Sequence, residues 1–467
     1  MNQYKRLMSN TMIFAIGTFS SKLLVFFMTR FYTAYLGSAD YGMIDVITSI
    51  ANVMIPIASL CIPQAVIRYG LEKTENKHEV FSVGVFTILI GFAITIPFFP
   101  LVDFTQGMDS LPVYTLIIYI YVLTASLQSL CSNFIRARGY VKLYAIDGIF
   151  RTAIIILLNI LFLAQLHWGI LGYIIAIIAS DLLSTICLSL IGRLPRFVHI
   201  HALNRKTWKR MLEYAIPLIP TQICVWVFSA SDRIFIQHMV GLEANGLYAL
   251  ANKLPTILVL VSGIFIDAWQ ISTINDNSHQ EQVDFFSKVG NVYQSLVFVM
   301  ASGVILICKP AIYVLAGQAS YFDAWKYVPL LIFGSAFACL SNFQNSIYTL
   351  HKKTSYSFLT AIIGAMLNLL LNYLMIPGMG ANGAALATLI SYIVMFLIRA
   401  VHSRKYLVVR WNILRFGTTF ILLCIQSALM LHNGPYWLSQ QIAFFLAISF
   451  LGSKEILLGV KKVLRRS

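Results

Sequence analysis

The stretch GILGYIIAIIASDLLSTICLSLIG, residues 169–192, contains a single charged side chain, Asp181, in 24 positions. About 20 consecutive apolar residues are enough for a helix to cross the hydrocarbon core of a bilayer. A helix satisfies its own backbone hydrogen bonds inside lipid, where water cannot do so. This stretch therefore predicts a transmembrane helix.

Comparable runs follow one another along the whole chain of 467 residues. Hydrophobic residues make up 58% of the sequence and charged residues 11%, whereas soluble domains carry about 25% charged residues. The runs are continuous and do not alternate, which favours helices over a membrane barrel. We therefore predict an all-α integral membrane protein with about 14 transmembrane helices, at residues 9–30, 42–67, 80–101, 111–135, 143–164, 169–192, 212–238, 246–271, 286–308, 327–350, 355–376, 382–401, 411–432 and 436–458.

The basic residues are distributed unevenly between the loops. Of the Lys and Arg residues in the loops and at the adjoining ends of the spans, 27 lie on the side of the N-terminus and only two, Lys309 and Lys326, lie on the other side. The positive-inside rule then predicts that both termini are cytoplasmic. It also explains the net charge of +16 without a nucleic acid, and we expect no nucleic-acid partner.

Short sequence matches indicate an internal repeat. The turn at 36–42 resembles the turn at 240–246, residues 132–134 match residues 341–343, and Leu158-Asn159 matches Leu367-Asn368. The offsets, 204 to 209 residues, span six predicted helices, so both halves have the same orientation. We predict two parallel six-helix repeats around a central cavity, where transporters of this type bind substrate. The predicted parts are an N-lobe at 1–195, a C-lobe at 196–405, and two extra helices with a basic cytoplasmic tail at 406–467.

No motif predicts catalysis, a metal site or a cofactor. The pattern Gly378-x-Gly380-x-x-Gly383 matches a dinucleotide fingerprint, but it follows an apolar helix and not a strand. We interpret it as a tight turn, and we expect a protein that is not an enzyme.

Prolines concentrate in three of the predicted spans: Pro56 and Pro63, Pro217 and Pro220, and Pro255. Proline removes a backbone hydrogen bond and bends a helix. Bent helices suit a transporter that alternates between two states, although static bundles contain them as well.

Charged residues inside the spans are the candidate site residues, because each costs a few kcal/mol at the bilayer centre unless it meets water or a partner. Cations from both halves would attract a large anion such as a pyrophosphate. The candidate substrate-binding cations inside the spans are Lys22, Arg30, Arg151, Arg233 and Lys253, and the candidate ion-coupling acids are Asp45, Asp147, Asp181 and Asp232.

Some of these charges have simpler interpretations. Asp147 and Arg151 are one helical turn apart in an order that favours an ion pair. Asp232 and Arg233 are adjacent, so we expect them to face different directions and not to pair. Arg30 lies near the outer end of its span and can extend to the interface.

We expect the side chains of Lys22 and Lys253 to face a cavity, because neither has an acidic residue one helical turn away.

Three segments carry a resemblance to a known family. The chain resembles the O-antigen and capsule repeat-unit flippases, the polysaccharide-export branch of the multidrug/oligosaccharidyl-lipid/polysaccharide exporter superfamily. The matching segments are Ser21-Lys22-Leu23-Leu24, Leu36-Gly37-x-x-x-Tyr41-Gly42 and Ile62-Pro63-Gln64-Ala65-Val66-Ile67-Arg68-Tyr69.

The resemblance implies a flippase of undecaprenyl-pyrophosphate-linked oligosaccharide in the bacterial cytoplasmic membrane. By position, Lys22 and Arg68 match basic sites of the family. The expected partners are H⁺ or Na⁺ as a coupling ion, a polysaccharide polymerase and membrane lipids. A lipid II flippase and a drug/cation antiporter of the same superfamily remain open as alternatives.

Overall fold

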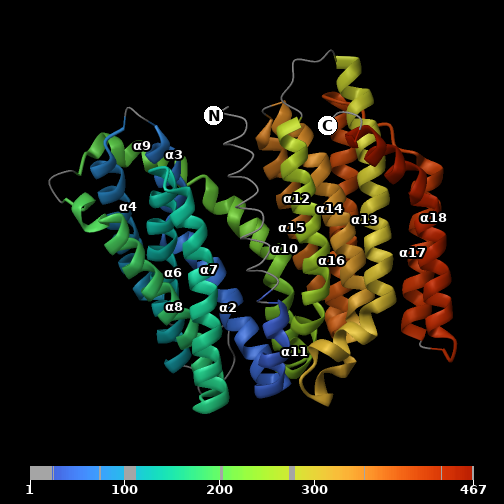
Figure 1. Cartoon of the computed structure of the whole chain (residues 1–467), viewed down its shortest axis with the longest axis horizontal. Coiled ribbons are helices and arrows are strands. Elements are labelled where there is room, and N and C mark those ends of the chain that lie inside the picture. Colours follow the sequence, from blue (N-terminus) through green and yellow to red (C-terminus); the bar gives the residue numbers. More distant parts are fainter. Residues whose placement is uncertain are drawn as a thin grey trace. The chain divides into compact units, whose positions relative to one another are not determined.

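The computed structural model describes residues 24, 26–72, 75–98, 112–199, 203–272, 279–351, 353–432 and 434–464. All regular elements in these ranges are helical (Figure 1). Twelve of the described helices are long and apolar enough to cross a membrane, and Trp437–Ser453 forms a shorter apolar helix. Most of the first predicted span lies outside the described residues, and its end continues as helix to residue 35. The prediction of an all-α membrane protein with about 14 transmembrane helices is confirmed.

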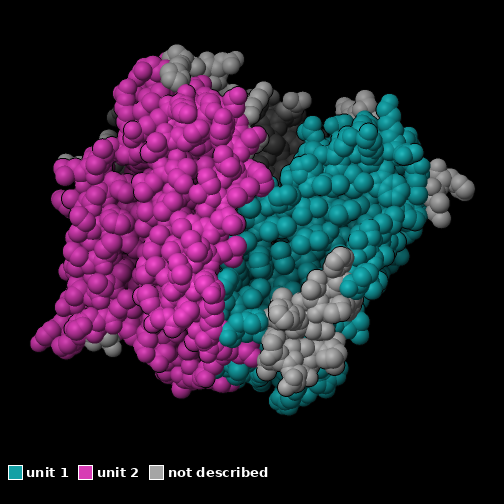
Figure 2. Space-filling view, turned by 180° about the vertical axis from the view of Figure 1, so that it is seen from behind, with its two compact units in different colours: residues 1–238 teal, residues 239–467 magenta. Residues whose placement is uncertain are grey.

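The chain divides into two compact units, Met1–His238 and Met239–Ser467 (Figure 2). The predicted lobe boundaries after residues 195 and 405 stay predictions. The first unit contains α2 (Ser38–Ala58), α3 (Ile62–Leu71), α4 (Lys77–Thr95), α6 (Pro112–Ala137), α7 (Val141–Asn159), α8 (Gly169–Gly192), α9 (Arg205–Ala215) and α10 (Leu218–Met239). The second contains α11 (Leu242–Ala251), α12 (Lys253–Ser272), α13 (His279–Leu315), α14 (Val328–Leu350), α15 (Thr354–Met379), α16 (Ala381–His402), α17 (Ile413–His432) and α18 (Trp437–Leu464).

The second predicted span is a broken helix. Between α2 and α3, Leu60 and Cys61 adopt φ values of 49° and 51°, a left-handed conformation that is costly for residues with a Cβ. Pro56 lies inside the last turn of α2 and Pro63 in the first turn of α3, where its missing N–H is not needed. The break therefore separates the span into two shorter helices.

Gly91 on α4 packs directly against this break. A Cβ at Gly91 would overlap the carbonyl oxygen of Ala58 and lie 3.3 Å from its carbonyl carbon. Because the obstructing atoms belong to the backbone at the end of α2, a side chain at this position cannot be accommodated by a change of rotamer.

The eighth predicted span is also interrupted. Helix α11 ends at Ala251, Asn252 forms a turn, and Lys253 begins α12. Pro255 lies in the first turn of α12, where proline is tolerated. The span in each predicted repeat that follows the matching turn is thus discontinuous.

Positions related by the repeat have similar environments. Gly37 and Gly241 each precede the helix that follows the matching turn. Asn159 and Asn368 are 0% and 1% exposed.

In the segment that matches the dinucleotide fingerprint, Gly380 has a φ of 58° and separates α15 from α16. The prediction of a turn in this segment is confirmed.

Candidate functional site

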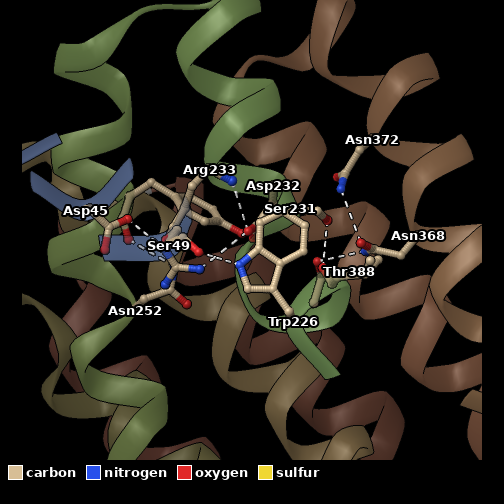
Figure 3. A network of polar contacts seen from close by, with 12 residues as sticks. Asp45, Ser49, Trp226, Ser231, Asp232, Arg233, Asn252, Asn368, Asn372 and Thr388 are labelled. Atoms are coloured by element: carbon tan, nitrogen blue, oxygen red, sulfur yellow. Dashed lines mark hydrogen bonds and ion pairs between the residues drawn. The ribbon is translucent and has the colours of Figure 1, made fainter. Parts of the chain in front are cut away.

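An ion pair links α2 and α10 within the first unit. The Nε of Arg233 lies 2.5 Å from Oδ2 of Asp45, and the two side chains are 15% and 20% exposed. Figure 3 shows them turned toward each other. One turn farther along α2, the carbonyl of Ser49 accepts a 2.6 Å hydrogen bond from the indole Nε1 of Trp226 on α10. Two contacts therefore connect the facing sides of these helices.

Asp232 also belongs to this cluster, so the expectation that it would not pair with Arg233 was wrong. Its Oδ1 accepts a 3.0 Å hydrogen bond from the backbone N–H of Arg233 and lies 3.5 Å from the Nη1 of that residue. The short carboxylate turns back toward the chain, and the long guanidinium reaches over it. One cation thus contacts two carboxylates.

A second polar cluster lies where α6, α7 and α8 pack against one another in the first unit (Figure 1). Asp147 on α7 accepts a 2.6 Å hydrogen bond from the hydroxyl of Ser184 and a 3.1 Å bond from Nε2 of Gln128. Ser184 also accepts a 3.3 Å bond from the Gln128 amide. The buried carboxyl of Asp147 is therefore surrounded by neutral donors from two neighbouring helices.

Arg151, one turn along α7, forms an ion pair with Asp181 on α8. The predicted pair between Asp147 and Arg151 is therefore wrong, because the guanidinium extends across to the next helix and contacts a carboxylate that is completely buried. Asp181 is 0% exposed and the Arg151 side chain is 33% exposed. Since an exposed guanidinium inside the bilayer is expensive, the outer part of Arg151 should meet water or an anion.

The remaining candidate cations have different surroundings. Lys22 lies outside the described residues. Arg30 is exposed near the end of the first span. Arg68 is 62% exposed at the end of α3 and forms a 3.9 Å pair with Glu72 one turn later.

Lys253 is half-buried at the first position of α12. Its ammonium has neither a hydrogen bond nor an ion pair with any residue that the structure describes. A cation at a helix N-terminus is also disfavoured by the helix dipole. These features agree with a cation held available for a ligand.

Sequence reasoning missed a buried cation in the second unit. Arg399 is one of the basic residues that the charge distribution assigns to the side of the N-terminus, but it is 4% exposed in the last turn of α16. It donates to the hydroxyls of Thr360 and Ser341 and to the carbonyls of Ser341 and Ser357. Its position at the end of an apolar run was the misleading signal.

Sequence reasoning also missed a chain of polar side chains in the second unit. Asn372 donates to Asn368 at 3.2 Å, and Asn368 donates to Thr388 at 3.1 Å (Figure 3). Asparagine inside an apolar span was the available signal, because an unsatisfied amide in a membrane is costly. Amides in apolar spans therefore indicate buried polar contacts as well as charges do.

The family can be assigned from comparison with known proteins. The family model described as polysaccharide biosynthesis protein matches residues 7–269. The chain belongs to the polysaccharide biosynthesis protein family.

Two known proteins align with most of this chain. An uncharacterized membrane protein, MJ1375 of Methanocaldococcus jannaschii, is 23% identical over 402 residues, which are 80% of this chain and 92% of the relative. The probable lipid II flippase MurJ of Thermotoga maritima is 24% identical over 352 residues, 70% of each chain.

Solved structures show the same fold. The lipid II flippase MurJ in an inward closed conformation superimposes with a TM-score of 0.73 at 16% identity, covering 96% of this chain and 99% of that one. An inward-facing multidrug resistance MATE family transporter gives 0.67 at 12% identity, with 87% and 99% covered. The fold is that of the multidrug/oligosaccharidyl-lipid/polysaccharide exporter superfamily. The chain is a multi-pass membrane protein.

Proposed function

We propose that this protein is a flippase that moves undecaprenyl-pyrophosphate-linked oligosaccharide repeat units across the bacterial cytoplasmic membrane by alternating access. Membership of the polysaccharide biosynthesis protein family is the observation that carries the proposal. The fold shared with a lipid II flippase supports it, and so do the guanidinium groups of Arg151 and Arg233, which lie in predicted spans. We expect no enzymatic activity, and we propose that both termini are cytoplasmic.

The pyrophosphate of the substrate gives these cations a role. Arg151 has a side chain that is one-third exposed inside a span, and Lys253 has an ammonium without a described partner. A guanidinium or ammonium binds phosphate oxygens through charge-assisted hydrogen bonds. Within the proposal, Arg233 contributes to substrate binding as part of its cluster with the carboxylates. Lys22, Arg30 and Arg68 stay proposed substrate-binding residues because of their positions in the sequence.

The acids provide candidate sites for a coupling ion, H⁺ or Na⁺. Asp45 and Asp232 share Arg233, and Asp147 and Asp181 lie in the cluster of α6, α7 and α8. Discontinuous helices are common at the binding sites of secondary transporters, and the breaks after α2 and α11 suit such a mechanism. A polysaccharide polymerase is the proposed downstream partner.

The substrate is tested in proteoliposomes that contain the purified protein and a fluorescent undecaprenyl-pyrophosphate oligosaccharide. We expect the labelled lipid to become accessible to a membrane-impermeant quencher faster than in protein-free vesicles. An undecaprenyl-pyrophosphate without sugar and an unrelated phospholipid are the controls. Equal rates for all three lipids would contradict the proposal.

Lys253→Ala should reduce export of surface polysaccharide at least tenfold in a deletion strain, because the loss of one charge-assisted contact to phosphate corresponds to about 1.5–3 kcal/mol. The protein should remain folded, since the ammonium has no described intramolecular partner. Lys405→Ala, which removes an exposed lysine of the same unit, is the matched control. Full export by Lys253→Ala at a normal protein level would remove Lys253 from the binding site.

A lipid II flippase is the second candidate, favoured by the similarity to the proteins of that name. The same vesicle assay separates the two candidates when lipid II replaces the oligosaccharide lipid. Rescue of a strain depleted of its own lipid II flippase would support this alternative. The fold similarity to a multidrug transporter makes drug efflux the third readout.

A further inference from the structure

The cluster between α6, α7 and α8 contains an unbalanced charge. Asp147 and Asp181 are two carboxyl groups in this cluster, whereas Arg151 is the single cation among the described residues that contacts either of them. With both acids ionised, the cluster would carry one net negative charge inside a membrane protein. Such a charge costs several kcal/mol when it is desolvated. The cluster is therefore expected to bind one positive charge, either a proton or a cation.

Asp181 is the carboxylate that the guanidinium neutralises. It is completely buried and in contact with Arg151, while its Oδ2 is buried and makes no hydrogen bond. No neutral donor from the described residues stabilises it. Its ionised form therefore depends on Arg151.

Asp147 has a different environment. The donors in contact with it, Ser184 and Gln128, are neutral, and Arg151 acts on it only at longer range. In the part of the chain that the structure describes, the other titratable groups near the cluster are Cys131 and Tyr121 on α6, neither of which supplies a positive charge. Asp147 and Asp181 also repel each other when both are ionised, which favours a shared proton.

We propose that Asp147 is a proton-binding site and that Arg151 moves between Asp181 and Asp147 according to the protonation of Asp147. In the described state Asp147 carries the proton and Arg151 pairs with Asp181. When the O–H bond of Asp147 breaks, its electron pair stays on the carboxylate and the proton leaves to water. Arg151 is one turn away on the same helix, a spacing at which Asp and Arg side chains meet, so it can then turn to Asp147.

At the corresponding place in the second unit, a cation contacts neutral groups. The offset of 209 residues between the repeats places Thr360 at the position that corresponds to Arg151. Thr360 accepts a hydrogen bond from Arg399 on the last helix of its repeat, and the partners of Arg399 among the described residues are neutral oxygens. Both repeats thus join their last two helices at this position, but the first has two carboxyl groups there. We therefore assign the proton to the first unit.

The inference refines the coupling part of the proposed function, but its test does not require transport. Infrared spectroscopy of the purified protein detects the C=O stretch of protonated carboxyl groups and its loss as the pH rises. The number of protons in the cluster should equal the number of acids minus the number of guanidinium groups. Relative to the wild type, Asp147→Asn and Asp181→Asn should each lose the signal of one protonated carboxyl, and Arg151→Gln should gain one.

Arg196→Gln removes an exposed arginine after α8 and should leave the carboxyl signal unchanged. An unchanged signal in Asp147→Asn, or no gain in Arg151→Gln, would overturn the proposal. If Asp147→Asn does not fold, the wild type is treated with dicyclohexylcarbodiimide, which modifies protonated carboxyl groups in apolar surroundings. Modification of Asp147 that decreases as pH rises is expected; modification of Asp181 instead, or of neither, contradicts the proposal.

The two proposals can fail separately. An infrared result that follows the proton count, together with no lipid movement in vesicles, would leave the proton site and reject the flippase. Lipid movement together with an infrared signal that does not change in Asp147→Asn would support the flippase and reject the proton site.

Discussion

Replacing Asp45 with alanine is expected to lower the free energy of unfolding by about 3 kcal/mol, near the lower end of the range for breaking a buried ion pair. The substitution removes the carboxylate that lies 2.5 Å from the guanidinium of Arg233, in a pair with little exposure. The guanidinium keeps its 3.5 Å contact with Asp232 on its own helix, whereas the ion pair between α2 and α10 is lost. Unfolding in mixed detergent micelles measures the effect.

The matched control is a pair of the same chemistry on the surface. Arg68 and Glu72 are 3.9 Å apart with side chains 62% and 40% exposed, so Glu72→Ala should cost less than about 0.5 kcal/mol. If Asp45→Ala costs no more than Glu72→Ala, the ion pair does not stabilise the contact.

Gly91→Ala is expected to destabilise the first unit by about 3 kcal/mol, the upper end of the range for overpacking. The new methyl group would overlap the carbonyl oxygen of Ala58 at the break between α2 and α3. Relief requires movement of α4 away from a backbone that already has left-handed residues at 60 and 61. The unfolding transition and the yield of monodisperse protein measure the effect.

Gly417→Ala provides the comparison, because a Cβ at this position of α17 has nothing within 4 Å. Alanine favours a helix over glycine by about 1 kcal/mol, so this variant should be as stable as the wild type or slightly more stable. A stable Gly91→Ala protein would show that the break is not held by close packing on α4.

The transmembrane helices could be predicted from the sequence because lipid imposes a local requirement. Each span must satisfy its backbone by itself and expose apolar side chains, and residues 169–192 meet both conditions without reference to any other segment. The turn at Gly380 was readable for the same reason, since its positive φ of 58° favours glycine at that position itself.

The helix breaks were only partly readable. Pro56 and Pro255 indicated bends in two spans, and the structure places a break near each of them. Proline alone did not indicate that Leu60 and Cys61 would turn left-handed. The backbone just before these residues packs against Gly91 of another helix, a contact that the local sequence does not reveal.

The pairing of the charged side chains was not predictable from spacing. Arg151 lies one turn from Asp147 but pairs with Asp181, and Arg399 lies at the end of an apolar run but is buried among hydroxyls and carbonyls. Long basic side chains reach partners on neighbouring helices, so the choice depends on distances that only packing determines.

The sequence by itself determined the membrane location, the number of helices and the residues that carry charge into the bilayer, because each follows from the cost of placing a local segment in lipid. Tertiary structure alone decided which carboxylate each guanidinium neutralises. In the α6–α8 cluster that choice leaves Asp147 with neutral donors, because the guanidinium of Arg151 extends to Asp181 on the neighbouring helix.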